Sequence, residues 1–141
     1  MKLFFQAIAF LGSLYFFLSI IILTFFFINP DYSIKLFLSL TITLVIVFSI
    51  RFFYFKQRPN KKKYKNLFQR LYNSSFPSVH AARAIILAYF FSKIYFNIIF
   101  IVGFWLIALL VCYSRIYMKD HYLIDVTSGA LLGMIISIFV L

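Results

Sequence analysis

Long apolar runs, each interrupted only briefly by polar residues, make up most of the chain. The first run extends from Leu3 to Ile28 and is long enough to cross the ~30 Å hydrocarbon core of a bilayer with some tilt. A cleavable signal peptide is the alternative, but it has a shorter apolar stretch followed by small residues. The pattern therefore predicts a transmembrane helix, closed by a turn at Asn29, Pro30 and Asp31.

A second apolar run, from about Ile34 to Phe55, predicts a second span with a charge near its end. Arg51 lies inside this run, where a charged side chain is costly and often marks a functional site. Arg58 follows at a distance close to two helical turns, so one continuous helix ending at Pro59 would project both arginines from one face. For Arg58, snorkelling to the lipid headgroups is an alternative.

The segment 60–75 is strongly basic, and its apolar residues recur on one helical stripe. This pattern predicts an amphipathic helix in the membrane interface, between the second and third spans, which would hold anionic lipid headgroups and cover a neighbouring site. A solvated basic loop is the alternative. The stripe consists of Tyr64, Leu67, Phe68, Leu71 and Tyr72.

Three further spans complete the predicted topology. Pro77, at the first helical position with serines beside it, predicts a helix start whose unpaired N–H groups can bind an anion. The apolar residues between His80 and His121 suffice for two short spans, which return the chain to the same membrane face. Both histidines and the two arginines should therefore meet at that face. The last span runs to Leu141 and contains small residues suited to close packing: Ser128, Gly129 and Gly133.

The composition fits an all-α, polytopic transmembrane helix bundle of about five spans, formed by a single domain over residues 1–141. Hydrophobic residues make up 65% of the chain, too many for a soluble domain. The net charge of +11 favours an anionic partner, such as lipid headgroups or a phosphorylated substrate. Nucleic acid is not expected as a partner, because no recognition module is visible. Cys112 is the only cysteine, so neither a disulfide framework nor a zinc site is predicted.

Charged groups concentrate between Ser114 and Asp125, a stretch that holds two of the three acidic residues. If the chain is helical from about His121, the imidazole and the Asp125 carboxylate lie one turn apart on one face. The carboxylate can then accept the Nδ1 proton and leave Nε2 as a base or nucleophile. A local hydrogen-bonded pair without a chemical role is the alternative. Arg115 supplies a planar fork of donors that suits phosphate oxygens.

Three separated segments together resemble the type 2 phosphatidic acid phosphatase superfamily, a group of histidine phosphatases. Their order along the chain is that of the family's three signature motifs. Two positions depart from the usual pattern: Arg51 stands in place of Lys, and Val79 in place of Gly. Since a β-branched residue avoids positive φ, the loop at Val79 should be helical or extended, and we expect altered specificity rather than loss of activity. The segments are R-x6-R-P at Arg51, Arg58 and Pro59; P-S-x-H at Pro77, Ser78 and His80; and S-R-x5-H-x3-D at Ser114, Arg115, His121 and Asp125.

The resemblance implies a role for each matching residue, and it implies neither a metal nor a cofactor. His121 would attack phosphorus to form a phosphohistidine, with Asp125 orienting the ring. His80 would protonate the leaving oxygen and later activate water. The phosphate-binding residues would be Arg51, Arg58, Ser78 and Arg115. The charged residues that match no motif position, Arg83, Lys119 and Asp120, are expected at the interface or behind the site.

The function implied by this resemblance is hydrolysis of a membrane lipid phosphate, of the phosphatidic acid, phosphatidylglycerol phosphate or polyprenyl diphosphate type. The alternative is a catalytically silent membrane protein that binds anionic headgroups, although such binding needs only Lys and Arg. A multi-pass protein of the cell membrane is expected. The positive-inside rule favours a cytoplasmic site, whereas many members of the family act on the extracytoplasmic face, so the face is left open. The sequence does not predict the oligomeric state.

Overall fold

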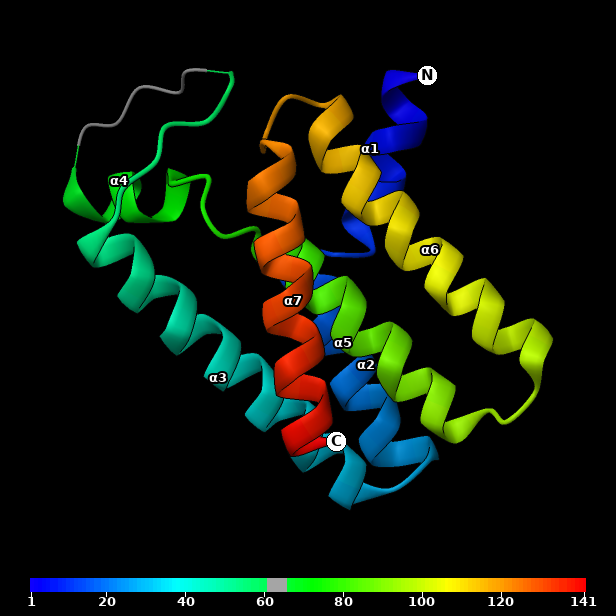
Figure 1. Ribbon diagram of the computed structural model, residues 1–141. Coiled ribbons are helices and arrows are strands. Elements are labelled where there is room, and N and C mark those ends of the chain that lie inside the picture. Colours follow the sequence, from blue (N-terminus) through cyan, green and yellow to red (C-terminus); the bar gives the residue numbers. More distant parts are fainter. Residues whose placement is uncertain (61–65) are drawn as a thin grey trace.

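The computed structural model describes residues 1–60 and 66–141, and these residues form a bundle of helices without strands (Figure 1). This architecture confirms the predicted fold class. Helix α5 lies in the centre of the bundle and packs most extensively against α6 and α7. The helices are α1 (Lys2–Phe10), α2 (Leu14–Phe27), α3 (Pro30–Phe53), α4 (Leu67–Asn73), α5 (Val79–Ile94), α6 (Ile98–Tyr117) and α7 (Leu123–Val140).

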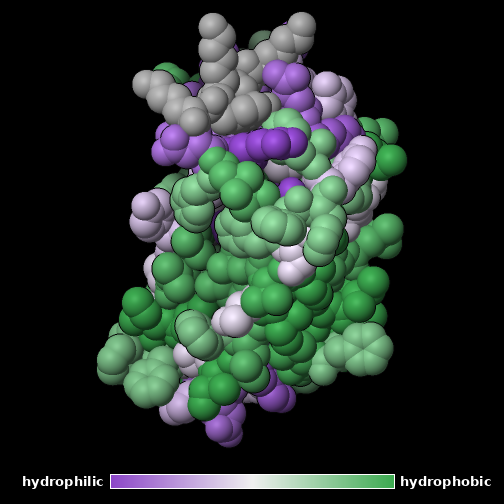
Figure 2. Space-filling view, turned by 90° about the vertical axis from the view of Figure 1, so that its left-hand side faces the viewer, coloured by the Kyte–Doolittle hydropathy of each residue, from purple (hydrophilic) through white to green (hydrophobic). Residues whose placement is uncertain are grey.

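The described helices can cross a membrane in approximately the predicted number of spans. Helices α3, α6 and α7 are each long and apolar enough, and the bent pair of α1 and α2 adds a fourth crossing if the two helices together make one span. Helix α5 has 16 residues, about 24 Å of helix, so it is shorter than the ~30 Å hydrocarbon core. Figure 2 shows a broad apolar surface below an end at which hydrophilic side chains gather. The chain is therefore an integral membrane protein, with the start of α5 recessed into the bundle (Figure 1).

The first predicted span is not one straight helix. Helices α1 and α2 are separated by Leu11, Gly12 and Ser13 and are bent by 43°. The Ser13 side chain accepts a hydrogen bond from the Phe16 N–H at 3.2 Å and so caps the start of α2. Gly12 lies against the backbone of His80, where an added Cβ would come within 3.0 Å of the His80 carbonyl oxygen. The break therefore lets the chain approach the first turn of α5 closely.

The second span begins and ends earlier than predicted. Its first residue is Pro30, because the Asn29 side chain caps the helix by accepting from the Asp31 N–H at 2.7 Å. It ends at Phe53, so Arg58 lies beyond α3, and the prediction that Arg51 and Arg58 share one helical face is wrong. The segment after α3 is extended, and it hydrogen-bonds to the serines before α5: Ser75 N donates to Lys56 O at 2.8 Å.

Helix α4 lies between α3 and α5, as predicted for the amphipathic segment. Its Leu67, Phe68 and Tyr72 side chains are exposed, which suits a helix lying in the membrane interface. The predicted stripe also included Tyr64, which lies outside the described residues.

Helices α5 and α7 each begin two residues later than predicted. Ser78 is the N-cap of α5, so Pro77 precedes the helix instead of occupying its first position. Tyr122 is the N-cap of α7, and the helix starts at Leu123. Val79 begins α5 in helical conformation, as its β-branched side chain predicts.

Two glycines of α7 allow it to pack directly on the backbone of α5. An added Cβ at Gly129 would collide with the Ser78 carbonyl group, and one at Gly133 would lie 2.5 Å from the Ala82 carbonyl oxygen. The Ser78 N–H also donates to the Asp125 carbonyl oxygen at 2.9 Å. This contact confirms the predicted use of small residues in the last span and fixes the starts of α5 and α7 side by side.

Gly129→Ala should destabilise the protein, whereas Gly103→Ala should not. Overpacking at the α5–α7 contact should lower the free energy of unfolding by about 1–3 kcal/mol. Gly103 has no neighbouring atom within 4 Å, so an added methyl group there is accommodated, and the helix propensity of Ala should add about 0.5–1 kcal/mol. Thermal unfolding of both variants in one detergent measures the difference. Equal midpoints would contradict the packing account.

Candidate active site

One cavity of about 450 Å³ at the hydrophilic end of the bundle brings together most of the predicted site residues. Arg51, Arg58, His80, Arg115 and His121 all line it, although they come from α3, α5, α6 and the segments between the helices. The predicted convergence of these residues at one face of the bundle is therefore confirmed. Ser78 and Asp125 are fully buried and lie outside the lining.

Arg51 joins α3 to the segment that precedes α5. Its Nη1 donates to the carbonyl oxygens of Leu71 and Tyr72 at 3.3 and 3.1 Å, and its Nη2 donates to the Pro77 carbonyl at 2.9 Å. The side chain is buried, and its Nε–H finds no acceptor among the described residues. Arg51 thus shapes the cavity wall and still has one unused donor.

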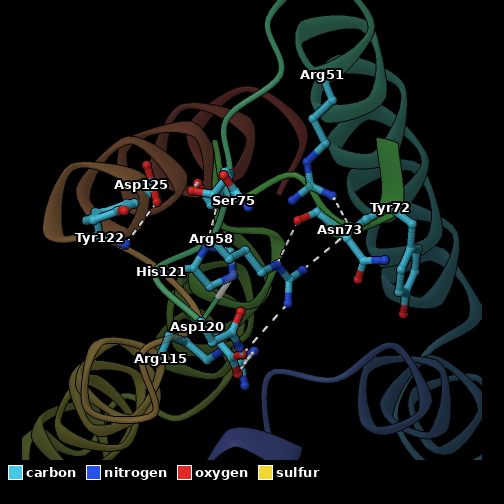
Figure 3. A network of polar contacts seen from close by, with 12 residues as sticks. Arg51, Arg58, Tyr72, Asn73, Ser75, Arg115, Asp120, His121, Tyr122 and Asp125 are labelled. Atoms are coloured by element: carbon cyan, nitrogen blue, oxygen red, sulfur yellow. Dashed lines mark hydrogen bonds and ion pairs between the residues drawn. The ribbon is translucent and has the colours of Figure 1, made fainter. Parts of the chain in front are cut away.

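Arg58 reaches the same wall from the extended segment after α3 (Figure 3). Its Nε donates to the Asn73 carbonyl at 2.9 Å, and its Nη1 lies 3.9 Å from Asp120 Oδ1. Tertiary contacts, and not a shared helix face, therefore bring Arg58 close to the position predicted for it.

Asp120 contacts Arg58, Arg115 and Asn60 and is the only carboxylate among these side chains. The sequence motifs did not indicate this role for Asp120. Its Oδ2 lies 2.8 Å from Arg115 Nη2, and its Oδ1 accepts from Asn60 Nδ2 at 2.8 Å. The carboxylate is buried and lines the cavity. Since it is held by Arg115, Asn60 and Arg58, it fixes the guanidinium groups in position. The sequence signal that could have marked Asp120 is the concentration of charged residues around it. Its neighbour Lys119 is exposed.

His121 is oriented by a backbone carbonyl, so the prediction that Asp125 accepts its Nδ1 proton is wrong for this structure. His121 Nδ1 lies 2.6 Å from the Ser75 carbonyl oxygen. A carbonyl only accepts, so Nδ1 carries the proton and Nε2 keeps its lone pair. The helical spacing argument fails because α7 starts at Leu123, which leaves His121 in the preceding loop.

Asp125 instead stabilises the start of α7 (Figure 3). Its Oδ2 accepts from the Tyr122 N–H at 2.9 Å, which caps the helix, and its Oδ1 lies 2.6 Å from Lys56 Nζ. The carboxylate is fully buried. Lys56 therefore neutralises a buried charge, and it matches no sequence motif.

The pKa of His121 is lowered from its ordinary value of 6.5 to about 3. Burial is the main cause, and the positive charges of Arg58 and Arg115 add to it, while the hydrogen bond to Ser75 acts in the opposite direction. In the absence of an anion the ring is therefore neutral at physiological pH. A neutral ring with a free Nε2 is the nucleophilic form of histidine.

Ser78 and His80 occupy the first turn of α5 but in different surroundings. The Ser78 hydroxyl accepts from the Ala81 N–H at 3.4 Å and caps the helix. His80 lines the cavity and is half-buried. The phosphate-binding role of Ser78 remains a prediction, since its side chain is used as a cap here.

Buried donors without acceptors mark the cavity as a site for an anion. The Nε–H groups of Arg51, Arg83 and Arg115 have no partner among the described residues, and all three side chains line the cavity. A buried donor left unpaired costs free energy, which a bound phosphate would recover. Within the described part of the chain, no three His, Cys, Asp or Glu side chains are placed to hold a metal ion.

The class that the fold and site define is an integral membrane protein, a helical bundle in which two histidines and four arginines line one cavity. The chain belongs to the PAP2 superfamily, whose sequence profile matches residues 32–141. This match confirms the family to which the three motifs pointed.

The comparisons with solved structures agree with this assignment. LpxE of Aquifex aeolicus superposes with a TM-score of 0.81 over 97% of this chain and 82% of its own, at 32% identity. A phosphatidylglycerolphosphate phosphatase of Bacillus subtilis shares the fold, with a TM-score of 0.78 over 99% of this chain and 74% of its own, at 23% identity. A lipid A 4'-phosphatase of Porphyromonas gingivalis is 38% identical over 65 residues, 46% of this chain but only 28% of that protein.

Lys56→Met should destabilise the protein because it leaves the Asp125 carboxylate buried without its cation. The expected loss in the free energy of unfolding is about 3 kcal/mol. Adding Asp125→Asn should restore most of it, since the amide oxygen can still accept from the Tyr122 N–H. Thermal unfolding of the single and double variants tests this. If the double variant is no more stable than Lys56→Met, the pair does not have the assigned role.

His80→Asn leaves His121 as the only histidine, so its ring nitrogens can be followed by 15N NMR in detergent micelles. Because the pKa is lowered, the ring should stay neutral from pH 8 to pH 5, and added inorganic phosphate should raise the pKa. The same protein unfolded in denaturant provides the control and should titrate near pH 6.5. A titration midpoint near pH 6.5 in the folded protein would contradict the account, because burial and the nearby arginines would then not lower the pKa of the ring.

Proposed function

We propose that this protein is a phosphatase that removes phosphate from a membrane lipid by way of a phosphohistidine at His121. The observation that supports it most directly is the fixed tautomer of His121 in an arginine-lined cavity. Nδ1 is held on the Ser75 carbonyl, so Nε2 is the nitrogen available for attack. The PAP2 relatives, among them a lipid A 4'-phosphatase, support the same reaction class.

In the first step, His121 Nε2 attacks phosphorus and the bond from phosphorus to the ester oxygen breaks. His80 donates a proton to that departing oxygen, so the lipid leaves as a neutral alcohol, or as a lipid monophosphate when the substrate is a diphosphate. The phosphate oxygens are bound by Arg51, Arg58 and Arg115, whose positive charge stabilises the transition state. The ring of His121 becomes positively charged as the N–P bond forms, and the Nδ1 proton shared with Ser75 stabilises that charge.

In the second step, His80 takes a proton from a water molecule that attacks the phosphohistidine. The N–P bond breaks, inorganic phosphate is released, and the His121 ring returns to its neutral form. No metal takes part in this scheme. Asp125 acts through the start of α7, which carries the loop that contains His121.

The proposed substrate is a lipid whose phosphate lies at the membrane interface while its tail stays in the bilayer. The apolar surface of the bundle and the position of the cavity at its hydrophilic end support this substrate class. Phosphatidic acid, phosphatidylglycerol phosphate, a polyprenyl diphosphate and lipid A phosphate are the candidates.

The detergent-purified protein should release phosphate from at least one of these lipids in the presence of EDTA. His121→Asn should reduce the rate by at least about a thousandfold, because it removes the nucleophile. Lys119→Met, an exposed change in the same loop, provides the matched control and should retain activity. If the folded wild-type protein releases no phosphate, or if His121→Asn remains active, the proposal fails. The first outcome would favour the alternative of a silent protein that binds anionic lipid.

A further inference from the structure

Arg83 carries a buried charge that the proposed reaction does not use. It lies one turn after His80 on α5, is only 6% exposed and lines the same cavity as the motif residues. At this side the cavity is bounded by Ser13, Leu14 and Tyr15, which belong to the break between α1 and α2 and the start of α2. The cavity therefore extends beyond the residues that surround the phosphate to be removed.

The described contacts satisfy Arg83 only in part. Its Nη1 donates to the Gly12 carbonyl oxygen at 3.3 Å, and its Nε–H has no acceptor among the described residues. A role limited to holding the α1–α2 break would need only the bond to Gly12. It would leave the positive charge buried without compensation, which is strongly unfavourable.

No carboxylate of the chain is left to neutralise Arg83. The sequence contains only three acidic residues. Asp120 is bound to Arg115, Asp125 is bound to Lys56, and Asp31 lies in the first turn of α3, at the far end of the bundle (Figure 1). A bound anionic group would supply the compensating charge.

The charge of the whole cavity leads to the same conclusion. Four arginines against one aspartate leave a net charge of +3, before the proton that His80 carries in the proposed first step is counted. A phosphate monoester contributes about −1.5 to −2 at neutral pH, so about one positive charge stays unmatched. A headgroup with a second anionic group would match it.

We infer that Arg83 and the α1–α2 break form a subsite for a second anionic group of the substrate headgroup, next to the phosphate that is removed. This inference rests on the proposed phosphatase function. The second group is either a phosphate joined directly to the first, as in a lipid diphosphate, or an anionic group elsewhere on the same headgroup. In both cases Arg83 sets substrate preference by binding a charge that a simple monophosphate lacks.

The test is a substitution of Arg83 measured on matched pairs of substrates. One pair is a prenyl diphosphate and the corresponding prenyl monophosphate; the other is phosphatidylglycerol phosphate and phosphatidic acid. In Arg83→Met the ratio of kcat/KM within one pair should fall at least about tenfold, the effect of losing one charge-assisted hydrogen bond. Arg83→Lys should keep part of the preference. Arg70→Met, which removes an exposed cation of α4, should leave both ratios unchanged.

Each outcome has a distinct meaning. A fall in the ratio for prenyl diphosphate over prenyl monophosphate identifies a diphosphate as the preferred headgroup. A fall in the ratio for phosphatidylglycerol phosphate over phosphatidic acid identifies a separate anionic group. Unchanged ratios in an active Arg83→Met overturn the inference but leave the phosphatase proposal intact, whereas wild-type protein inactive on all four lipids removes the proposal itself. If Arg83→Met does not fold, Arg83→Lys decides on the same two pairs of substrates: a lowered ratio in either pair supports the inference, and ratios equal to those of the wild type overturn it.

Discussion

The burial of three arginine side chains, Arg51, Arg83 and Arg115, around one cavity is the constraint on which the arrangement of the site depends. A guanidinium group in a membrane protein needs acceptors for its donors and an opposite charge, and the chain has very few carboxylates. Backbone carbonyls supply most of the acceptors: Arg51 and Arg58 both bind carbonyl groups in the last turn of α4, and Arg51 also binds the Pro77 carbonyl before α5. The carbonyl groups in the last turn of a helix have no partner within that helix, so the arginines use acceptors that α4 leaves free. Non-helical backbone is tolerated at this depth because its polar groups are used by the arginines and by the cavity.

The buried arginines also determine the protonation state of His121. Burial and the surrounding positive charge keep its ring neutral, and the Ser75 carbonyl leaves Nε2 without a proton. The recessed start of α5 places His80 along the wall of the same cavity. Close packing of Gly129 on Ser78 joins α5 to α7, so the proposed nucleophile His121 and the proposed acid His80 are positioned by one close contact between helices. A lipid phosphate entering from the interface would meet both groups together.

Much of this arrangement could be predicted from the sequence, because its signals are periodic or local. Apolar runs of sufficient length predicted the helices. Two spans between the histidines predicted that His80, His121, Arg51 and Arg58 would meet at one face. The errors concern features set by tertiary contacts. The α1–α2 break depends on the approach of Gly12 to His80, and the end of α3 depends on hydrogen bonds to Ser74 and Ser75. The partner of Asp125 was missed because Lys56 is distant in sequence, and the spacing of His121 and Asp125 assumed a helix that starts later.

The measurement that tests the central claim most directly is chemical trapping of the covalent intermediate. A lipid substrate with radioactive phosphorus would be mixed with the purified protein, quenched within the first turnover, and the protein digested under alkaline conditions that preserve phosphohistidine. The account predicts label on the peptide that contains His121, and none in His121→Asn. Turnover by the wild type without any labelled protein, or label that persists in His121→Asn, would contradict it.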